Sequence, residues 1–367
     1  MTARRTSVAI VGGGLSGLYA ARLLQEAGTD FQLLEARERF GGRILSVDET
    51  GKPSAAGFDL GPSWYWPQMH PRMARVVDQL GLRSFPQYAD GDIVVERSPS
   101  EAPQRFPAMR QEPQSMRLAG GTGAIVAALE NALPAERLHR GARVTRVTIT
   151  PSGPLLSFDD GTGQGEVAAR QVILALPPRL AASAVAFEPV LPPAILDRWH
   201  ETATWMAPHA KFFALYDRPF WRESGLSGSA HSGVGPLVEI HDATSATGAA
   251  ALFGFLGIAR RQRITVGEDV LVRASIAQLT RMFGPRAAQP RATLFKDWTA
   301  DGFTSTGADE IANGHPVPDR RPWIMGDWAR HVSLAGSETS TTDPGYLAGA
   351  LDAAERAVRE VIGRLGC

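Results

Sequence analysis

Three glycines near the start of the chain have the spacing of a nucleotide-binding turn. The sequence reads Gly12-x-Gly14-x-x-Gly17 and follows an apolar run at residues 7–11 that predicts a buried strand. Such glycines permit a tight turn and let backbone N–H groups approach a pyrophosphate at the N-terminus of the next helix. Glu35 follows Gly17 by 18 residues, where a carboxylate can accept both ribose hydroxyls. This carboxylate argues against a 2′-phosphate and so against NADP, and the flanking strand and helix argue against a glycine turn without a ligand.

One lysine stands where a charge is costly. Lys211 lies within the apolar run at residues 210–214, which predicts a buried strand. The only other lysines are Lys52 and Lys296. A buried ammonium needs a partner, and buried lysines often have a chemical role. In the alternative interpretation, the stem of Lys211 crosses the strand and its head reaches solvent.

A second glycine motif extends the nucleotide-binding pattern. Residues 35–37 read Glu-Ala-Arg and residues 41–43 read Gly-Gly-Arg. This arrangement resembles the flavin-containing monoamine oxidase family. The resemblance implies that the glycine pair lies close to the pyrophosphate of FAD and that Arg43 offers a fork of donors to its oxygens. A surface salt bridge is the alternative role of Arg43.

Further segments resemble the same family, in order, over most of the chain. They are residues 58–64, 120–123, 143–144, 172–178, 216–221, 296–298 and 334–346. The resemblance implies an FAD enzyme. The residues that it assigns to the cofactor are Gly12, Gly14, Ser16, Gly17, Glu35, Ala36, Arg37, Gly42, Arg43, Gly61, Pro62, Ser63, Trp64, Val144, Gly336, Ser337, Glu338, Tyr346 and Leu347.

A long helix is predicted to close the chain, from about residue 345 to residue 365. A helix N-terminus carries roughly half a positive charge. At the N1–C2 carbonyl edge of a flavin, it would stabilise the anion that reduction creates, with donors around Tyr346 and Leu347. The helix also has apolar residues at helical spacing, as an ordinary core helix does.

The resemblance assigns three residues to the catalytic site. Lys211 matches a lysine that holds a water near flavin N5 and assists the reaction of reduced flavin with oxygen. Tyr346 matches one of the two aromatic walls that flank the substrate amine, and Trp298 matches a tryptophan that packs near the flavin ring. For both aromatic residues, core packing is the alternative.

The chain departs from the family pattern in three places. Residues 304–308 contain no cysteine where covalent members attach their cofactor, so we predict non-covalent FAD. The same stretch has no aromatic residue near Ala308 to form the second wall, and Phe303 is the candidate replacement. Residues 82–120 predict only a Pro-rich loop in place of a helical substrate cap. We therefore expect an open site that suits a bulky or carrier-bound amine.

The bulk composition excludes several other classes of protein. The 38 acidic and 38 basic side chains balance, which argues against a nucleic acid or an anionic membrane as partner. No apolar stretch has the length of a membrane helix, and the single cysteine does not point to an oxidising compartment, so we expect a cytoplasmic protein. The eight histidines are scattered, and we predict no metal site. The oligomeric state is not indicated.

The predicted fold is α/β. A Rossmann-like, doubly wound FAD domain comprises residues 1–66, 119–185 and 325–367. An inserted α+β substrate domain on a mixed sheet comprises residues 67–118 and 186–324. Strands are predicted at residues 31–34, 138–149, 154–159, 171–176, 210–216, 249–257 and 332–334, and helices at 18–27, 71–80, 122–133 and 345–365.

The predicted function is oxidation of an amine C–N bond by hydride transfer to flavin N5. Oxygen is the expected acceptor, which gives an imine or carbonyl and hydrogen peroxide. Three alternatives stay open: a flavin dehydrogenase or desaturase with another acceptor, an oxidase of reduced nicotinamides, and a non-catalytic FAD-binding partner protein.

Overall fold

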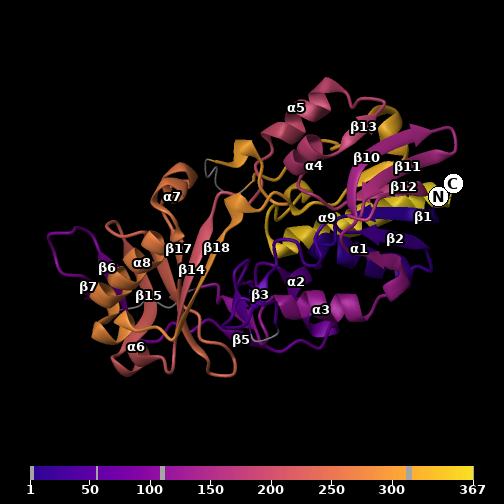
Figure 1. Cartoon of the computed structure of the whole chain (residues 1–367). Helices are drawn as coiled ribbons and strands as arrows, with labels where there is room; N and C mark the ends of the chain where they lie inside the picture. Colours follow the sequence, from indigo (N-terminus) through magenta and orange to yellow (C-terminus); the bar gives the residue numbers. More distant parts are fainter. Residues whose placement is uncertain (1–3, 55–56, 108–111, 311–315, 367) are drawn as a thin grey trace.

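Two β-sheets organise the chain in the computed structural model, which describes residues 4–54, 57–107, 112–310 and 316–366. Figure 1 shows a larger lobe that contains both chain ends and a smaller lobe built from the middle of the sequence. The strands of each sheet come from separate stretches of the chain. The predicted insertion of one folding unit within another is therefore visible in the topology.

The sheet of the larger lobe has the order β13–β10–β11–β12–β1–β2–β9, with β19 beside β12. Its central strands β12, β1 and β2 are parallel, whereas β10, β11 and β12 form an antiparallel meander. The strands are β1 (Arg4–Val11), β2 (Phe31–Leu34), β9 (Leu138–His139), β10 (Arg143–Thr150), β11 (Gly153–Asp159), β12 (Gln164–Leu174), β13 (Ala186–Glu188) and β19 (Val332–Leu334).

Helices cover both faces of this sheet because both faces of β1 are apolar. Val8 and Ile10 belong to a core with α1 (Leu15–Glu26), α2 (Pro71–Gln79), α3 (Gly123–Asn131) and α9 (Leu347–Leu365). Ala9 and Val11 point the other way, into a core with α4 (Pro178–Ala184) and α5 (Pro193–Glu201). Buried residues on both faces are typical of a parallel sheet between two helical layers.

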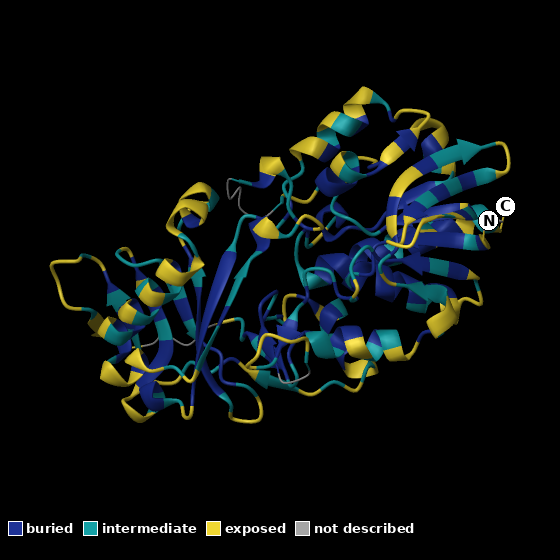
Figure 2. Ribbon diagram, in the orientation of Figure 1, coloured by how far each residue is buried: buried dark blue, intermediate teal, exposed yellow. Residues whose placement is uncertain are grey.

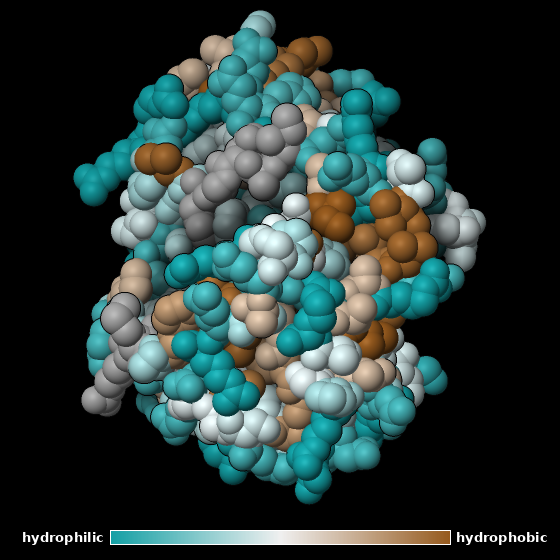
Figure 3. All heavy atoms as spheres, turned by 90° about the vertical axis from the view of Figure 1, so that its left-hand side faces the viewer, coloured by the Kyte–Doolittle hydropathy of each residue, from teal (hydrophilic) through white to brown (hydrophobic). Residues whose placement is uncertain are grey.

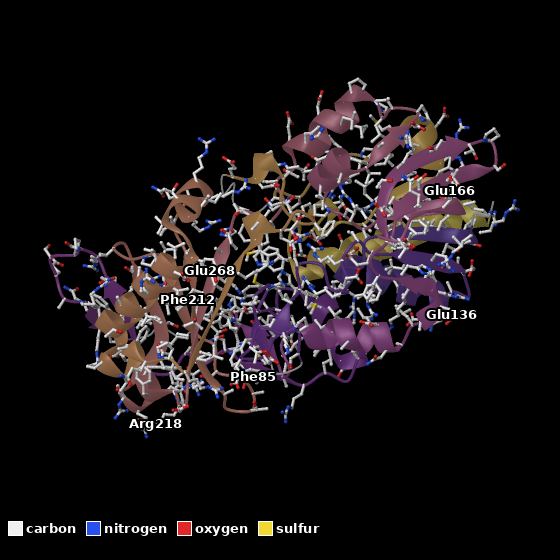
Figure 4. The ribbon with its side chains drawn as sticks, viewed as in Figure 1. Phe85, Glu136, Glu166, Phe212, Arg218 and Glu268 are labelled. Carbon is white, nitrogen blue, oxygen red and sulfur yellow. The ribbon has the colours of Figure 1, made fainter. Side chains whose placement is uncertain are left out.

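The sheet of the smaller lobe has the order β18–β14–β17–β16–β15–β6–β7. One face packs against α8 (Glu268–Phe283), and Phe212, labelled in Figure 4, belongs to that core. The strands are β6 (Asp92–Glu96), β7 (Gln104–Phe106), β14 (Ala210–Tyr216), β15 (Leu226–Ser232), β16 (Leu237–Asp242), β17 (Ala250–Leu256) and β18 (Ala292–Asp297). The opposite face of β14 and β17 carries the residues that become important below.

The remaining elements of the described chain are short. They are the strand pairs β3 (Ser46–Val47) with β4 (Phe58–Asp59) and β5 (Ser84–Pro86) with β8 (Met116–Leu118), the helices α6 (Phe220–Glu223) and α7 (Arg260–Val266), and the 3-10 turns η1 (Ala135–Arg137), η2 (Pro285–Ala288), η3 (Trp298–Ala300), η4 (Gly307–Asp309), η5 (Gly326–Arg330) and η6 (Ser337–Thr339).

The segment at residues 82–120 is not the plain loop that the sequence predicts. It contributes β6 and β7 to the second sheet, and β5 pairs with β8. The prolines of this segment favour the prediction of a loop. Strand β6 is a parallel neighbour of β15, which lies more than a hundred residues later in the chain. Such a pairing leaves no signal in the local sequence. No helical cap forms among the described residues of this segment.

The lobes divide the chain differently from the predicted domains in two places. Helix α2, predicted in the substrate domain, packs with Met73, Val76 and Val77 into the core of the larger lobe. Strand β13 pairs with β10, and Trp199 of α5 is buried in the larger lobe as well. The sequence of an amphipathic helix does not indicate which of two cores will bury its apolar face. These domain boundaries could therefore not be predicted from the sequence.

Burial follows the two sheets. Figure 2 shows the buried residues concentrated in the strands and in the helix faces that meet them, while α7 and the β6–β7 tip are exposed. The face drawn in Figure 3 is mostly hydrophilic, with a few hydrophobic patches. Among the described residues, no helix combines the length and the apolar composition that a membrane crossing demands.

The first turn of α1 requires glycine at position 17. A Cβ at Gly17 would lie 1.9 Å from Gly12 O, so an added methyl group collides with backbone that cannot yield. We expect Gly17→Ala to lower the free energy of unfolding by more than about 3 kcal/mol or to prevent folding. Chemical denaturation of the purified variants measures this.

Gly363 in α9 is the matched control, because an added Cβ there meets no heavy atom within 4 Å. Gly363→Ala should stabilise the protein by up to about 1 kcal/mol through higher helix propensity. Equal effects of the two substitutions would contradict the tight packing at Gly17.

Candidate active site

A cavity of about 420 Å³ is lined by residues of both lobes. From the larger lobe come the glycine turn, the segment around Gly42, the loop around Gly61 and the start of α9. From the smaller lobe come Lys211, Glu239, His241 and Phe255. The predicted site residues on its wall are Gly12, Gly14, Ser16, Glu35, Arg37, Gly42, Arg43, Gly61, Pro62, Ser63, Trp64, Lys211, Gly336, Ser337, Tyr346 and Leu347.

The N-terminus of α1 opens onto the cavity. Its N-cap is Gly14, which offers no side chain to the N–H groups of the first turn. Gly14 forms a parallel bridge with Gly41, and an added Cβ at Gly42 would lie 3.3 Å from Gly14 Cα. Two glycine segments therefore cross in close contact, and side chains at these positions would fill the space in front of the helix.

Glu35 is held beside this helix start with both oxygens engaged. Oε2 accepts from the N–H of Gly13 at 2.6 Å, and Oε1 accepts from the N–H of Arg37 at 2.8 Å. The carboxylate is nearly buried but still reaches the cavity wall. Each carboxylate oxygen keeps a second lone pair, so Glu35 can still accept two hydroxyl donors.

The N-terminus of α9 also opens onto the cavity. Its N-cap is Tyr346, which makes no side-chain capping bond, and Tyr346 and Leu347 both line the cavity. The positive end of this helix therefore points at the cavity wall. The two helices that open onto the cavity are far apart in the sequence and pack against one another in the first core.

An ion pair joins the segments that carry these two ends. Arg43 Nη1 lies 2.6 Å from Glu338 Oε1, Arg43 Nη2 donates to Glu338 Oε2 at 3.1 Å, and the Glu338 side chain is fully buried. Arg43 Nη2 also donates to the Ser337 hydroxyl at 3.0 Å, and Nη1 to Trp205 O at 2.9 Å. Arg43 still reaches the wall, but its fork is occupied by a carboxylate, so this side chain holds the C-terminal motif in place.

These residues fit an FAD molecule. An uncapped helix start with a glycine cradle suits a pyrophosphate, and a carboxylate beside it suits a ribose. A second uncapped helix start suits an aromatic ring that gains negative charge on reduction. When bound, FAD supplies the acceptor of electrons at its flavin ring. No group of three or more potential metal ligands occurs among the described residues.

Lys211 is buried in the cavity wall with three acceptors. Its Nζ donates to Gly61 O at 2.6 Å, to the Ser63 hydroxyl at 3.0 Å and to Asp59 O at 3.2 Å. Phe253 and Phe255 lie below it, with the Nζ 4.6 Å and 5.0 Å from the ring centroids. Burial lowers the pKa of Lys211 to about 7. The ammonium therefore braces the loop at residues 59–63 against β14.

A row of side chains continues from Lys211 across the sheet. In the strand register, Lys211 is opposite Phe255 of β17, and Phe255 is opposite Glu239 of β16. Directly opposed residues share a face, so all three project toward the cavity. His241 donates to Glu239 at 2.7 Å, which lowers the pKa of that carboxyl. The wall thus presents an ionised carboxylate two strands from Lys211, a separation of roughly 10 Å.

Aromatic rings form much of the remaining wall. The ring of Tyr346 packs against those of His70, at 5.2 Å, and Trp66, at 6.1 Å between centroids. Trp66, Trp205, Phe303 and Tyr346 all line the cavity. Phe303, the candidate second wall, is exposed and lies 5.4 Å from the Arg37 guanidinium.

Five predicted residues lie behind the wall. Trp298 is fully buried, and its Nε1 donates to Leu60 O at 2.9 Å, so it supports the loop at residues 59–63 from outside the cavity. Glu338 is taken up by Arg43. The Val144 side chain belongs to the second core, Gly17 packs on Gly12, and Ala36 does not reach the cavity.

Sequence reasoning missed several residues of the wall, chiefly Trp66, Gln87, Trp205, Glu239 and His241. Residues 238–241 alternate apolar and polar side chains, a short strand signal that could have placed Glu239 and His241 on one face. Trp66, Gln87 and Trp205 lie outside regular elements and carried no periodic signal.

The depressed pKa of Lys211 gives a test in the absence of any ligand. Between pH 7 and about pH 10.4 the unfolded chain holds a proton that the folded chain has lost. Stability should therefore rise with pH across this window, by up to about 1.4 kcal/mol per pH unit from this group alone. Lys211→Met should remove that part of the slope, as urea denaturation of apoprotein from pH 6 to 10 measures.

Lys52→Met, at an exposed lysine, is the control and should keep the slope. If Lys211→Met also leaves the slope unchanged, the lysine is charged throughout this range in the folded state.

Comparisons with known proteins identify the family. The family model described as flavin containing amine oxidoreductase matches residues 15–113 and 90–362. A probable flavin-containing monoamine oxidase A from Dictyostelium discoideum is 24% identical, over 98% of each chain, in an alignment of 463 positions that is longer than this chain. A flavin-containing amine oxidase from Danio rerio is 26% identical over 100% of this chain and 87% of its own.

Solved structures agree on the fold. Putrescine oxidase bound to putrescine has a TM-score of 0.79 at 21% identity, and covers 99% of this chain and 100% of its own. Cyclohexylamine oxidase from Brevibacterium oxydans has a TM-score of 0.80 with the same identity and coverage. The predicted α/β fold with an FAD domain is confirmed, as are the predicted family, the FAD cofactor and the assignment as an enzyme. The chain belongs to the family of flavin-containing amine oxidoreductases.

Proposed function

We propose that the protein oxidises a C–N bond of an amine, with hydride transfer to flavin N5 and molecular oxygen as the final acceptor. The products are an imine, which hydrolyses to a carbonyl compound, and hydrogen peroxide. The observation that carries the proposal is that Lys211 and Tyr346 line the same cavity as the two uncapped helix starts. Cofactor binding alone would not require both a buried lysine and a tyrosine on the cavity wall.

The chain's own residues bind and orient the substrate in this scheme. The faces of Tyr346 and Trp66 provide an electron-rich surface for an amine. The apolar wall excludes water and favours the neutral amine, which has the lone pair that hydride loss requires. Lys211 holds the loop at residues 59–63 in position through three donated bonds.

The cavity wall also bears on the class of amine. Glu239 is ionised and faces the cavity from β16, and its partner His241 packs edge-on against Trp64 at 4.8 Å. A carboxylate near aromatic rings of the wall suits a second positive charge on the substrate. Putrescine, bound in one structural neighbour, is a substrate of this kind. We therefore propose a diamine or another amine with a distal cation.

One observation favours a second candidate, a flavin dehydrogenase with another electron acceptor. In its protonated form Lys211 has a protein acceptor for each of its three protons, namely Asp59 O, Gly61 O and the Ser63 hydroxyl. Such a lysine has no further donor to position a water or oxygen unless one of these bonds is released. The reaction with oxygen therefore decides between the two candidates.

Anaerobic reduction of the purified yellow protein tests the reaction class. We expect putrescine and related diamines to bleach the flavin absorption band more efficiently than monoamines of the same length, and NADH and NADPH not to bleach it. Admission of air should restore the colour within seconds and produce one peroxide per carbonyl. A stopped-flow spectrophotometer and a peroxide assay measure both steps.

Other outcomes would point elsewhere. Bleaching without return of colour in air would favour the dehydrogenase. Bleaching by reduced nicotinamides alone would make it a nicotinamide oxidase, and reduction by no donor would indicate a non-catalytic FAD-binding protein.

Glu239→Gln tests the choice of substrate. Removing the charge while keeping the shape should lower kcat/KM for putrescine by about 10- to 100-fold, because a charged hydrogen bond is worth about 1.5–3 kcal/mol. The value for butylamine should change by less than about threefold.

Glu166→Gln is the control, since Glu166 is exposed in the larger lobe, as Figure 4 shows. It should change neither value. Equal losses for putrescine and butylamine in Glu239→Gln would mean that Glu239 does not bind a distal cation.

A further inference from the structure

We infer that residues 301–309, called here the retaining segment, hold FAD in place without a covalent bond. Asp301 and Asp309 act in this scheme as positioning residues. The segment follows β18 of the smaller lobe, but its two aspartates bind arginines of the larger lobe (Figure 1). The inference rests on the FAD cofactor and not on the oxidation of any amine.

The first tie lies at the start of the retaining segment. Arg37 Nη2 is 2.6 Å from Asp301 Oδ1, and the same nitrogen donates to the Thr304 hydroxyl at 2.8 Å. Burial opposes the ionisation of Asp301, but the charges of Arg37 and Lys296 outweigh it and lower its pKa. Both partners are mostly buried, so solvent screens this pair little.

The second tie lies at the end of the segment. Arg179, in the first turn of α4, forms a buried ion pair with Asp309. Arg179 also donates to His200 O at 2.7 Å, and Asp309 Oδ2 accepts from the N–H and hydroxyl of Thr306 at 2.9 and 2.8 Å. The aspartate thus shapes the end of the segment and fastens it to the larger lobe.

Between the two ties the segment forms part of the cavity. Phe303 and Thr304 line the wall, as do Glu35 and Arg37. Arg37 lies 3.7 Å from Glu35 Oε1, so the guanidinium contacts both the ribose-binding acid and the retaining segment. A cofactor held at Glu35 therefore has the tied segment among its neighbours.

This geometry ties cofactor release to the opening of the segment. To move Phe303 and Thr304 away from the wall, at least one buried ion pair must separate, which leaves charges in a poorly solvated place. Such a barrier lowers the rate of FAD dissociation, and it does so without strengthening a particular contact to FAD. This barrier would retain FAD in a chain whose residues 304–308 contain no cysteine for a covalent link.

An ordinary lobe-to-lobe contact would show the same ion pairs, so the test must separate retention from stability. The experiment mixes purified holoenzyme with excess apo-glucose oxidase, an apoprotein that binds FAD, and follows the release of FAD by the glucose oxidase activity that appears. Asp301→Asn keeps the size of the side chain and removes the charge. We expect FAD to dissociate at least about tenfold faster from this variant.

Two further variants make the result decisive. Asp319→Asn breaks an ion pair of similar length but greater exposure, between Asp319 and Arg198 at 2.9 Å, in a part of the chain that does not line the cavity. It should leave the dissociation rate unchanged. Thr304→Val removes the bond to Arg37 and leaves Asp301 in place, and it should speed dissociation by about two- to fivefold, which provides a reading even if Asp301→Asn does not fold.

Thermal melting of the apoproteins is the second readout. Asp301→Asn and Asp319→Asn should each lower the apoprotein Tm, while only Asp301→Asn loses part of the Tm increase that FAD produces. An unchanged dissociation rate in Asp301→Asn, or in Thr304→Val where Asp301→Asn cannot be purified, would overturn the inference. Equal acceleration by Asp319→Asn would also overturn it. Wild-type protein that holds FAD but oxidises no amine would contradict only the proposed function.

Discussion

The burial of two helix N-termini at one cavity is the constraint on which the rest of the structure depends. The first N–H groups of a helix have no partner within the helix, and in α1 and α9 no side chain caps them. An arrangement of this kind is stable only where water or a ligand accepts those bonds. The close glycine crossing at residues 12–17 and 41–42 clears the space in front of α1, and the Arg43–Glu338 pair holds the segment before α9 against it.

The second sheet supplies the reactive surface because its two faces differ. Phe212 and its neighbours on one face pack against α8, whereas Lys211, Phe255 and Glu239 face the cavity from three adjacent strands. Because side chains alternate between the two faces of a strand, this register places a lysine at one end of the wall and a carboxylate at the other. The same register places the two charges apart, so they do not neutralise one another.

Much of this site could be predicted from the sequence, because its cofactor half is built from local motifs. The glycine turn, Glu35 and the long helix after Tyr346 each sit beside the strand or helix that positions them, and their local order survives folding. The substrate half could not be predicted in this way. Glu239 reaches the cavity through the pairing of β16 with β17, and β6 joins the sheet through β15, which are contacts that no local pattern records.

Tyr346 has a second large aromatic ring near it on the cavity wall, although no aromatic residue stands near Ala308. Trp205 also lines the cavity, and an added Cβ at Gly345 would lie 3.0 Å from the Trp205 Cβ, so this tryptophan packs directly against the turn before Tyr346. The backbone of Trp205 is bound on both sides by the central ion pair: its carbonyl accepts from Arg43 at 2.9 Å, and its N–H donates to Glu338 at 3.3 Å. One buried ion pair therefore positions both the start of α9 and a second aromatic ring. An aromatic wall can thus move to a different segment of the chain while the charges that hold it stay in place.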